Sequence, residues 1–163
     1  MSLCQTRSRA LLVTLLVICS AHGAVVLGAD SDSRPAPHRE CTSKEAYDAE
    51  GQSAPTSWQE FYAAYKRYGH CDTGAIAEGY SDFAATLAAD QWDQLDVLDA
   101  LTRAHPAFRK FVLDHLNVTM NLDQAQAIQL NASTRCPQKA KKLCSAILQR
   151  VKEATTPDPR NSR

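Results

Sequence analysis

Apolar residues recur at helical spacing along most of the chain after residue 56. The first such stretch has apolar residues at positions i, i+3, i+4 and i+7, which are Trp58, Phe61, Tyr62 and Tyr65. This spacing places them on one face of an amphipathic helix. No stretch alternates polar and apolar residues as a strand does, and no internal repeat is present. The pattern predicts an all-α domain, a small bundle of about five or six short helices over residues 57–153.

Polar residues mark the expected starts of several helices. The segments Thr42–Glu45 and Ser57–Glu60 both match the capping box, in which a hydroxyl and a carboxylate satisfy free backbone amides. Asn121–Gln124 predicts a further capped start, and Pro106 suits the first position of another helix.

Glycines and off-face aromatic residues indicate where helices end. Gly69 predicts a left-handed stop for the first helix of the domain. Gly74 and Gly79 predict close approach of a neighbour to the second helix, whose apolar stripe is Ile76, Tyr80, Phe83 and Leu87. Trp92 falls off this stripe, so we expect that helix to break near Asp90.

The apolar faces of these helices together predict the hydrophobic core. Its expected members are Trp58, Phe61, Tyr65, Ile76, Tyr80, Phe83, Leu87, Leu98, Phe108, Phe111, Val112, Leu143, Ile147 and Leu148.

The first 29 residues have the pattern of a secretory signal peptide. Arg7 and Arg9 precede an apolar run over residues 10–19, and small residues follow at 21–23 and 27–29 as candidate cleavage sites. One alternative is an uncleaved anchor, because residues 10–29 carry no charge. Another is a lipoprotein modified at Cys19, which the bulky Ile18 disfavours. The signal predicts a periplasmic or secreted protein that is not membrane-bound after cleavage.

Two segments flank the helical domain. Residues 30–56 are poor in large apolar residues and predict an extended arm with one short helix, attached to the domain through Cys41. Residues 154–163 contain Pro157 and Pro159 and predict a disordered tail.

Four cysteines remain after the signal: Cys41, Cys71, Cys136 and Cys144. In an exported domain this even number predicts two disulfides. If Cys136 and Cys144 lay on one helix, their Cα atoms would be ~12 Å apart, whereas a disulfide requires less than roughly 7 Å. We therefore expect each of these two to pair with Cys41 or Cys71.

The charges of the chain are balanced in total but segregated along the sequence. After residue 29 there are 16 basic and 18 acidic residues, a net charge of −2, which does not favour nucleic-acid binding. Residues 72–101 contain no Lys or Arg and seven acidic residues, which are Asp72, Glu78, Asp82, Asp90, Asp93, Asp96 and Asp99. Residues 135–152 contain no acid and six basic residues, which are Arg135, Lys139, Lys141, Lys142, Arg150 and Lys152.

This segregation has two interpretations. In the first, the charges serve only the fold: each segment is the solvated face of its helix, or the two segments attract each other. Alternatively, the acidic segment binds a protein partner with a basic surface. The contact candidates are then Asp90, Asp93, Asp96 and Asp99, flanked by Glu78 and Asp82.

The tripeptide His70-Cys71-Asp72 contains three residue types that perform chemistry. The even cysteine count favours a disulfide for Cys71 over a nucleophile, and Asp72 or Thr73 suits the cap of the next helix. The alternative is a small hydrolase or metal-dependent enzyme centred on His70, Asp72 and Glu78. No G-x-S-x-G, H-x-x-x-H or Cys-x-x-Cys pattern is present, and no cofactor is expected.

The block 69–81 (GHCDTGAIAEGYS), followed by Trp92 and the segment 106–113, resembles a group of uncharacterised small exported helical proteins of Gram-negative bacteria. The architecture of a signal peptide and a small disulfide-linked helical domain is also similar to periplasmic immunity proteins that neutralise type VI amidase effectors. These resemblances imply a periplasmic binding protein or inhibitor. A bacterial source would make the glycosylation patterns at Asn117 and Asn131 chance matches.

Overall fold

The computed structural model describes residues 39–156. This range contains seven α-helices and no strand, which confirms the all-α prediction. The predicted signal peptide, the alternatives at residues 10–29, the beginning of the arm and the last seven residues of the tail lie outside the described residues.

The helices are short and follow one another closely. The α-helices are α1 (Ser43–Glu50), α2 (Trp58–Tyr68), α3 (Gly74–Asp90), α4 (Leu95–Ala104), α5 (Pro106–His115), α6 (Leu122–Thr134) and α7 (Lys141–Thr155). Single 3-10 turns lie in three of the connections: η1 (Gly69–Cys71) before α3, η2 (Trp92–Gln94) before α4 and η3 (Gln138–Ala140) before α7. Six α-helices therefore fall within the predicted domain, and the break expected near Asp90 is present.

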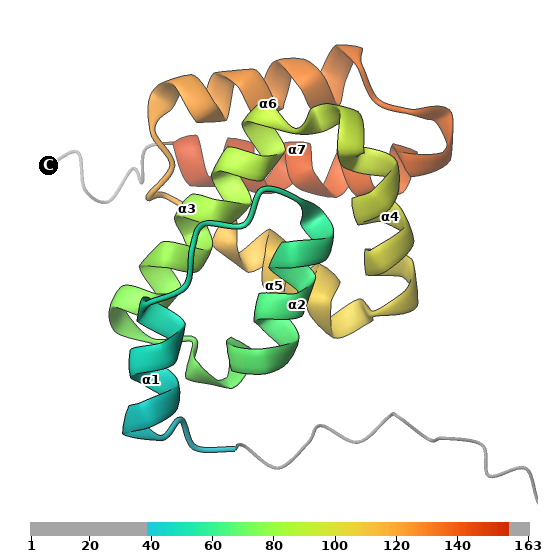
Figure 1. Cartoon of the computed structure of the whole chain (residues 1–163). Coiled ribbons are helices and arrows are strands. Elements are labelled where there is room, and N and C mark those ends of the chain that lie inside the picture. The colour runs from blue at the N-terminus through green and yellow to red at the C-terminus, as the bar shows by residue number, and fades with distance from the viewer. Residues whose placement is uncertain (1–38, 157–163) are drawn as a thin grey trace, which may run out of the picture. The chain divides into compact units, whose positions relative to one another are not determined.

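Helix α3 is central to the packing. It contacts α1, α2, α5 and α6, while α6 and α7 lie side by side as an antiparallel pair (Figure 1). Helices α4 and α5 pack on each other, and α5 also contacts α7. None of the helices in residues 39–156 is long and apolar enough to cross a membrane.

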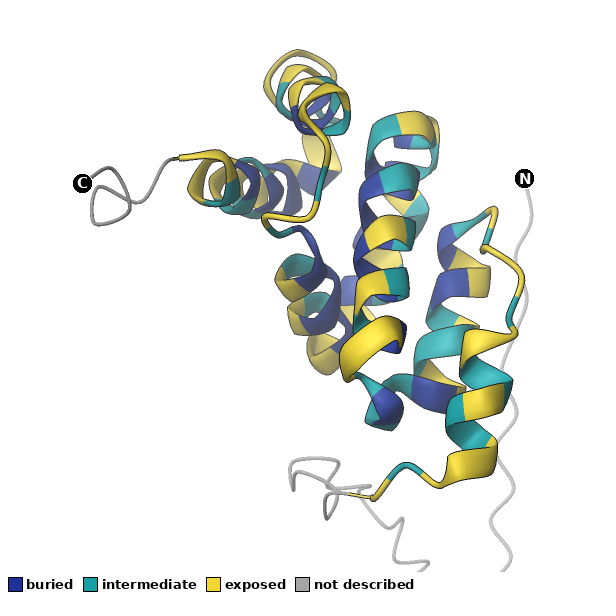
Figure 2. Cartoon of the chain, turned by 90° about the vertical axis from the view of Figure 1, so that its left-hand side faces the viewer, coloured by how far each residue is buried: buried dark blue, intermediate teal, exposed yellow. Residues whose placement is uncertain are grey.

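The buried residues face inward from every helix except α1, which has none (Figure 2). Eleven of the predicted core residues are buried, while Tyr65, Phe83 and Leu148 are half-buried and pack against the core. The buried residues outside the predicted core include the large side chains of Tyr68, Trp92, Leu95, Leu116, Ile128 and Val151.

Phe61 is the centre of the aromatic part of the core. Its side chain is fully buried, and its ring centroid lies 5.9–6.1 Å from those of Trp58, Tyr80, Phe108 and Phe111. These rings come from α2, α3 and α5, so the cluster joins three helices. Tilted and edge-to-face pairs of this kind add stabilisation beyond their buried area.

The predicted helix starts are confirmed, with one adjustment. Thr42 and Asn121 each complete a reciprocal capping box. Ser57 caps α2 by accepting a hydrogen bond from the Glu60 amide, but the Glu60 carboxylate accepts from the amide of Thr56 instead of Ser57. Pro106 occupies the first turn of α5, as expected.

Helix α2 ends at Gly69 as predicted, but the conformation expected there and the close approach expected at Gly74 and Gly79 are wrong. Gly69 is right-handed, with φ −59° and ψ −18°, because the chain continues into η1. A Cβ there would lie 2.8 Å from the Tyr65 ring, so a larger residue at this position would have to displace that ring. No atom of a neighbouring element lies within 4 Å of a Cβ built at Gly74 or Gly79, so neither glycine serves the close approach of another helix. Gly74 instead adopts φ +55°, which favours glycine.

The disulfides pair differently from the sequence-based prediction. Cys41 bonds Cys71, with Cα atoms 4.9 Å apart, and thereby attaches the arm to the domain as expected. Cys136 bonds Cys144 across a Cα distance of 6.1 Å, which the prediction had disfavoured. The two do not share a helix, because α7 begins only at Lys141 and the extended Pro137 followed by η3 turns the chain back.

Candidate functional sites

The predicted acidic surface is largely exposed, with one exception. Five of its carboxylates are exposed, namely Glu78, Asp82, Asp90, Asp93 and Asp96. Asp99 is buried, which makes its assignment as a partner contact wrong. Because α4 begins at Leu95, Asp99 falls on the same face as Leu95 and Thr102, and its carboxylate lies 2.8 Å from a guanidinium nitrogen of Arg103.

The acidic and basic segments are not joined by ion pairs. Among the described residues, none of the five exposed carboxylates forms an ion pair. The interpretation that the two segments attract each other through direct contacts therefore has no support in residues 39–156. We call the three exposed carboxylates where α3 passes into α4 the acidic corner, and its members are Asp90, Asp93 and Asp96.

The backbone beneath the acidic corner is fixed to the end of α6. The Trp92 indole nitrogen donates a 3.1 Å hydrogen bond to the carbonyl of Arg135. The buried Asn131 side chain donates to the carbonyl of Ala89, and its oxygen accepts from the Arg135 guanidinium. These bonds tie both sides of the corner to one helix end, so the carboxylates project from a rigid support.

The three residues of the 70–72 tripeptide have different partners. Cys71 is buried in its disulfide, so it is not a thiol nucleophile. His70 Nε2 lies 3.4 Å from Glu45 Oε1 on α1. Asp72 Oδ2 lies 3.2 Å from His115 Nε2 at the end of α5. Of the two residues predicted to cap α3, Asp72 and Thr73, Thr73 occupies the N-cap position, but its side chain makes no capping hydrogen bond.

Asp72, His115 and Ser81 form a row of hydrogen-bonded side chains that the sequence did not reveal. Ser81 Oγ lies 2.9 Å from His115 Nδ1, and the opposite nitrogen of that ring faces Asp72. A carboxylate only accepts, so a neutral His115 carries its proton on Nε2 and accepts through Nδ1. The single hydroxyl proton of Ser81 is then shared between His115 Nδ1 and the carbonyl of Ala77, which lies 3.0 Å from Oγ. Asn117 donates to Ser81 from the loop after α5.

This row has the residue types of a serine hydrolase, but its hydroxyl is enclosed. Ser81 is 3% exposed and lies within α3, next to the buried Tyr80. It lines neither the groove between α1 and α2 nor the cavity between α4, α5 and the beginning of α7. The role that fits this burial is structural, because hydrogen-bonded side chains in the row join the 69–73 loop, α3 and α5. Only Oδ2 of Asp72 takes part, since its buried Oδ1 has no partner among the described residues.

The proposed metal set does not converge. Glu78 is exposed on α3, while His70 and Asp72 face α1 and α5 respectively. Across residues 39–156, no three His, Cys, Asp or Glu side chains are arranged to hold a metal ion. The alternative of an enzyme centred on these three residues therefore gains no geometric support.

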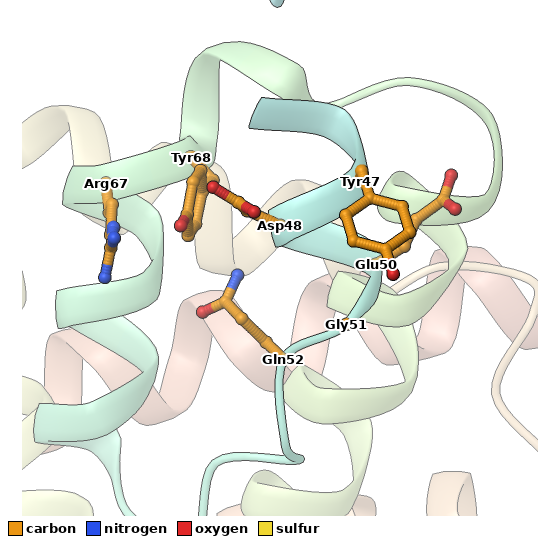
Figure 3. A pocket seen from close by; sticks show the side chains of 7 residues that line it. All are labelled: Tyr47, Asp48, Glu50, Gly51, Gln52, Arg67 and Tyr68. Atoms are coloured by element: carbon orange, nitrogen blue, oxygen red, sulfur yellow. The ribbon is translucent and has the colours of Figure 1, made fainter. Parts of the chain in front are cut away.

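A polar groove lies between α1 and α2 (Figure 3). Arg67 and Tyr68 project from α2, while Asp48 and Gln52 come from α1 and the segment after it. The Arg67 guanidinium stacks on the Tyr68 ring at 5.0 Å. On the α1 side Tyr47 is 78% exposed, so this groove is open to solvent.

The asparagine side chains of the two glycosylation patterns are engaged in the fold. Asn131 is buried and Asn117 is bonded to Ser81, so neither amide is free in the folded chain.

No protein-family model matches this sequence, and comparison with curated proteins and with solved structures gave no match.

Proposed function

We propose that this chain is an exported, non-catalytic binding protein that recognises a protein partner with a basic surface. The observation that carries the proposal is the acidic corner, whose three carboxylates are exposed and form no ion pair among the described residues. Unpaired charges on a rigid surface raise the association rate and the selectivity for an oppositely charged partner.

The setting of the corner favours recognition over catalysis. The hydrogen bonds of Trp92 and Asn131 hold the backbone beneath it, so little conformational entropy is lost on binding. Glu78 and Asp82 extend the negative charge along the exposed side of α3. The two disulfides suit an oxidising compartment, in agreement with the periplasmic or secreted localisation expected from the N-terminal pattern.

In its finer form, the proposal is an immunity-type inhibitor of a cell-wall-degrading effector. Its support is the architectural resemblance to periplasmic immunity proteins. The partner would then carry its basic surface near the mouth of its active site, where a bound acidic corner obstructs substrate.

The first experiment measures binding after charge reversal at the corner. The immobilised chain captures partners from an envelope extract at low salt, and the captured protein is purified for affinity measurements. We expect Asp93→Lys with Asp96→Lys to weaken binding by roughly tenfold or more, and added salt to weaken the wild-type complex. A second variant with Asn at both positions tests the loss of charge without introducing cations.

A matched control carries the same change in net charge elsewhere. Glu40 and Asp123 are exposed, and Asp123 lies at the opposite end of α6 from Arg135. The control variant Glu40→Lys with Asp123→Lys should bind as the wild type does. Equal affinity of all the variants would contradict the acidic-corner proposal.

The finer proposal has its own measurement. Stoichiometric addition of the chain should abolish peptidoglycan hydrolysis by the captured partner, and the corner variant should fail to do so. A partner without cell-wall hydrolase activity would contradict the inhibitor form and leave the binding form standing.

A further inference from the structure

A cavity with strongly basic walls lies between α4, α5 and the beginning of α7. Its volume is about 560 Å³, which is within the range of small-molecule sites. The charged residues that line it are Asp99, Arg103, Arg109, Lys139, Lys141 and Lys142. Five cations thus surround one carboxylate, and we call this the basic cavity.

The only carboxylate of the basic cavity is already neutralised. Asp99 Oδ2 lies 2.8 Å from Arg103, and the Asp99 side chain is 7% exposed. Within the described part of the chain, Arg109, Lys139, Lys141 and Lys142 form no ion pair. Four uncompensated positive charges around one cavity repel one another, and a bound anion would relieve that repulsion.

Two helix beginnings add to the positive potential. The first turn of α7 contributes Lys141, Lys142 and Leu143, and the first turn of α5 contributes Pro106. Pro106 has no amide N–H and α7 continues directly from η3, so the two helices favour an anion through their dipoles and not through a set of free amides. The positive ends of both helix dipoles therefore border the cavity.

The Cys136–Cys144 disulfide holds one wall of the cavity in place. The bonded segment contains Gln138, Lys139, Lys141 and Lys142, all of which line the cavity. Lysine side chains on a constrained loop lose less entropy when they bind than those on a free loop.

We propose that the basic cavity binds a multivalent phosphate group, either on a soluble phosphorylated molecule or on a lipid headgroup. A pyrophosphate or phosphomonoester carries more than one negative charge and can therefore compensate several of the four unpaired cations. Arg109 supplies a planar fork for two phosphate oxygens, and the lysines supply adaptable point charges. The site is separate from the acidic corner and does not rest on the proposed function.

The experiment uses the oxidised full chain with inorganic pyrophosphate as the probe. Calorimetry at low ionic strength should give one site, and pyrophosphate should raise the melting temperature. Lys139→Gln with Lys142→Gln should weaken binding by roughly tenfold or more, because charge-assisted bonds are lost. The matched control Lys66→Gln with Lys152→Gln removes two exposed cations outside the cavity and should retain wild-type affinity.

A vesicle arm distinguishes the two sources of phosphate. Sedimentation is compared between phosphatidylcholine vesicles with and without phosphatidic acid. Binding to the phosphatidic acid vesicles that is lost in the cavity variant assigns a lipid headgroup, whereas pyrophosphate binding alone assigns a soluble ligand. Binding of neither probe, or equal weakening in the cavity and control variants, would overturn the proposal. The Asp93→Lys with Asp96→Lys variant should keep pyrophosphate binding, which separates this test from that of the acidic corner.

Discussion

Ser81 Oγ lies 2.9 Å from His115 Nδ1, although 34 residues separate these two buried side chains. Helix α3 carries the serine and α5 carries the histidine, so the bond joins the two helices inside the core. Asp72 and Asn117 complete the polar environment on either side. Buried groups of this kind contribute little when satisfied and cost much when left unpaired.

Ser81→Ala should therefore destabilise the fold by about 1–3 kcal/mol, because His115 Nδ1 and the Asn117 amide lose their partner. Urea unfolding followed by circular dichroism measures this free energy. Ser145→Ala is the matched control, since Ser145 is exposed on α7 and should shift stability by less than about 0.5 kcal/mol. Equal effects of the two substitutions would show that the row is not a structural element.

Ile147→Ala should cost roughly 2–5 kcal/mol, since removing a fully enclosed side chain leaves a cavity. Ile147 is completely buried, whereas the neighbouring Leu148 is only half-buried. Leu148→Ala on the same helix should consequently cost less in the same unfolding assay. A larger loss for Leu148 would contradict the orientation of α7.

The two disulfides should differ in their contributions to stability. The Cys41–Cys71 bond closes a separation of 30 residues and the Cys136–Cys144 bond one of 8. Loop-entropy arguments give about 3.5 and about 2.5 kcal/mol respectively. Replacing each pair with Ser and comparing thermal unfolding tests this order. Peptide mapping without reductant should recover Cys136 linked to Cys144, and any peptide linking Cys136 to Cys71 would refute the pairing.

Helix α1 should loosen in acid. The backbone amide and hydroxyl of Thr42 donate to the Glu45 carboxylate, with His70 and Arg39 adding to the effect, and its pKa falls from 4.5 to about 2. A carboxylate whose pKa is lower in the folded chain than in the unfolded chain stabilises the fold at pH values above the unfolded pKa. This contribution is lost as the pH falls from 4.5 towards 2.

Hydrogen exchange of the α1 amides at pH 5 and pH 2 measures that loss. Glu45→Gln keeps an acceptor for the capping box but has no charge to titrate. Its α1 protection should therefore vary less with pH over this interval. A wild-type protection profile that is the same at both pH values would contradict the assignment.

The helices were predictable because each carries local signals that tertiary contacts did not override. The capping residues Thr42, Ser57 and Asn121 and the apolar stripe of α3 act within a few residues of chain. Asp99 was wrongly predicted to be exposed because acidic residues spaced three apart do not show which of them faces the core. Only the start of α4 at Leu95 turns Asp99 inward.

Features assembled from distant segments could not be predicted. The basic cavity combines Arg103 and Arg109 with lysines near residue 140, and the sequence showed only the second group as a charged run. The polar row had one weak signal, since Ser81 and His115 each interrupt an apolar helix face. The Cys136–Cys144 pairing was missed because a single turn, η3, reverses the chain between two positions that appeared to share a helix.

Helix α1 contributes no buried residue. Its half-buried Ala46 and Ala49 pack against the core, and the Cys41–Cys71 bond and the contact of Glu45 with His70 attach it further. Its placement thus depends on a covalent bond as well as on a small packed area. In a compartment that keeps thiols reduced, we expect helices α2 to α7 to retain their shared core and residues 39–50 to become accessible to proteases. A chain synthesised in such a compartment and delivered to an oxidising one would complete its fold only on arrival. Resistance of residues 39–50 to proteolysis would then show that the chain has reached the oxidising compartment.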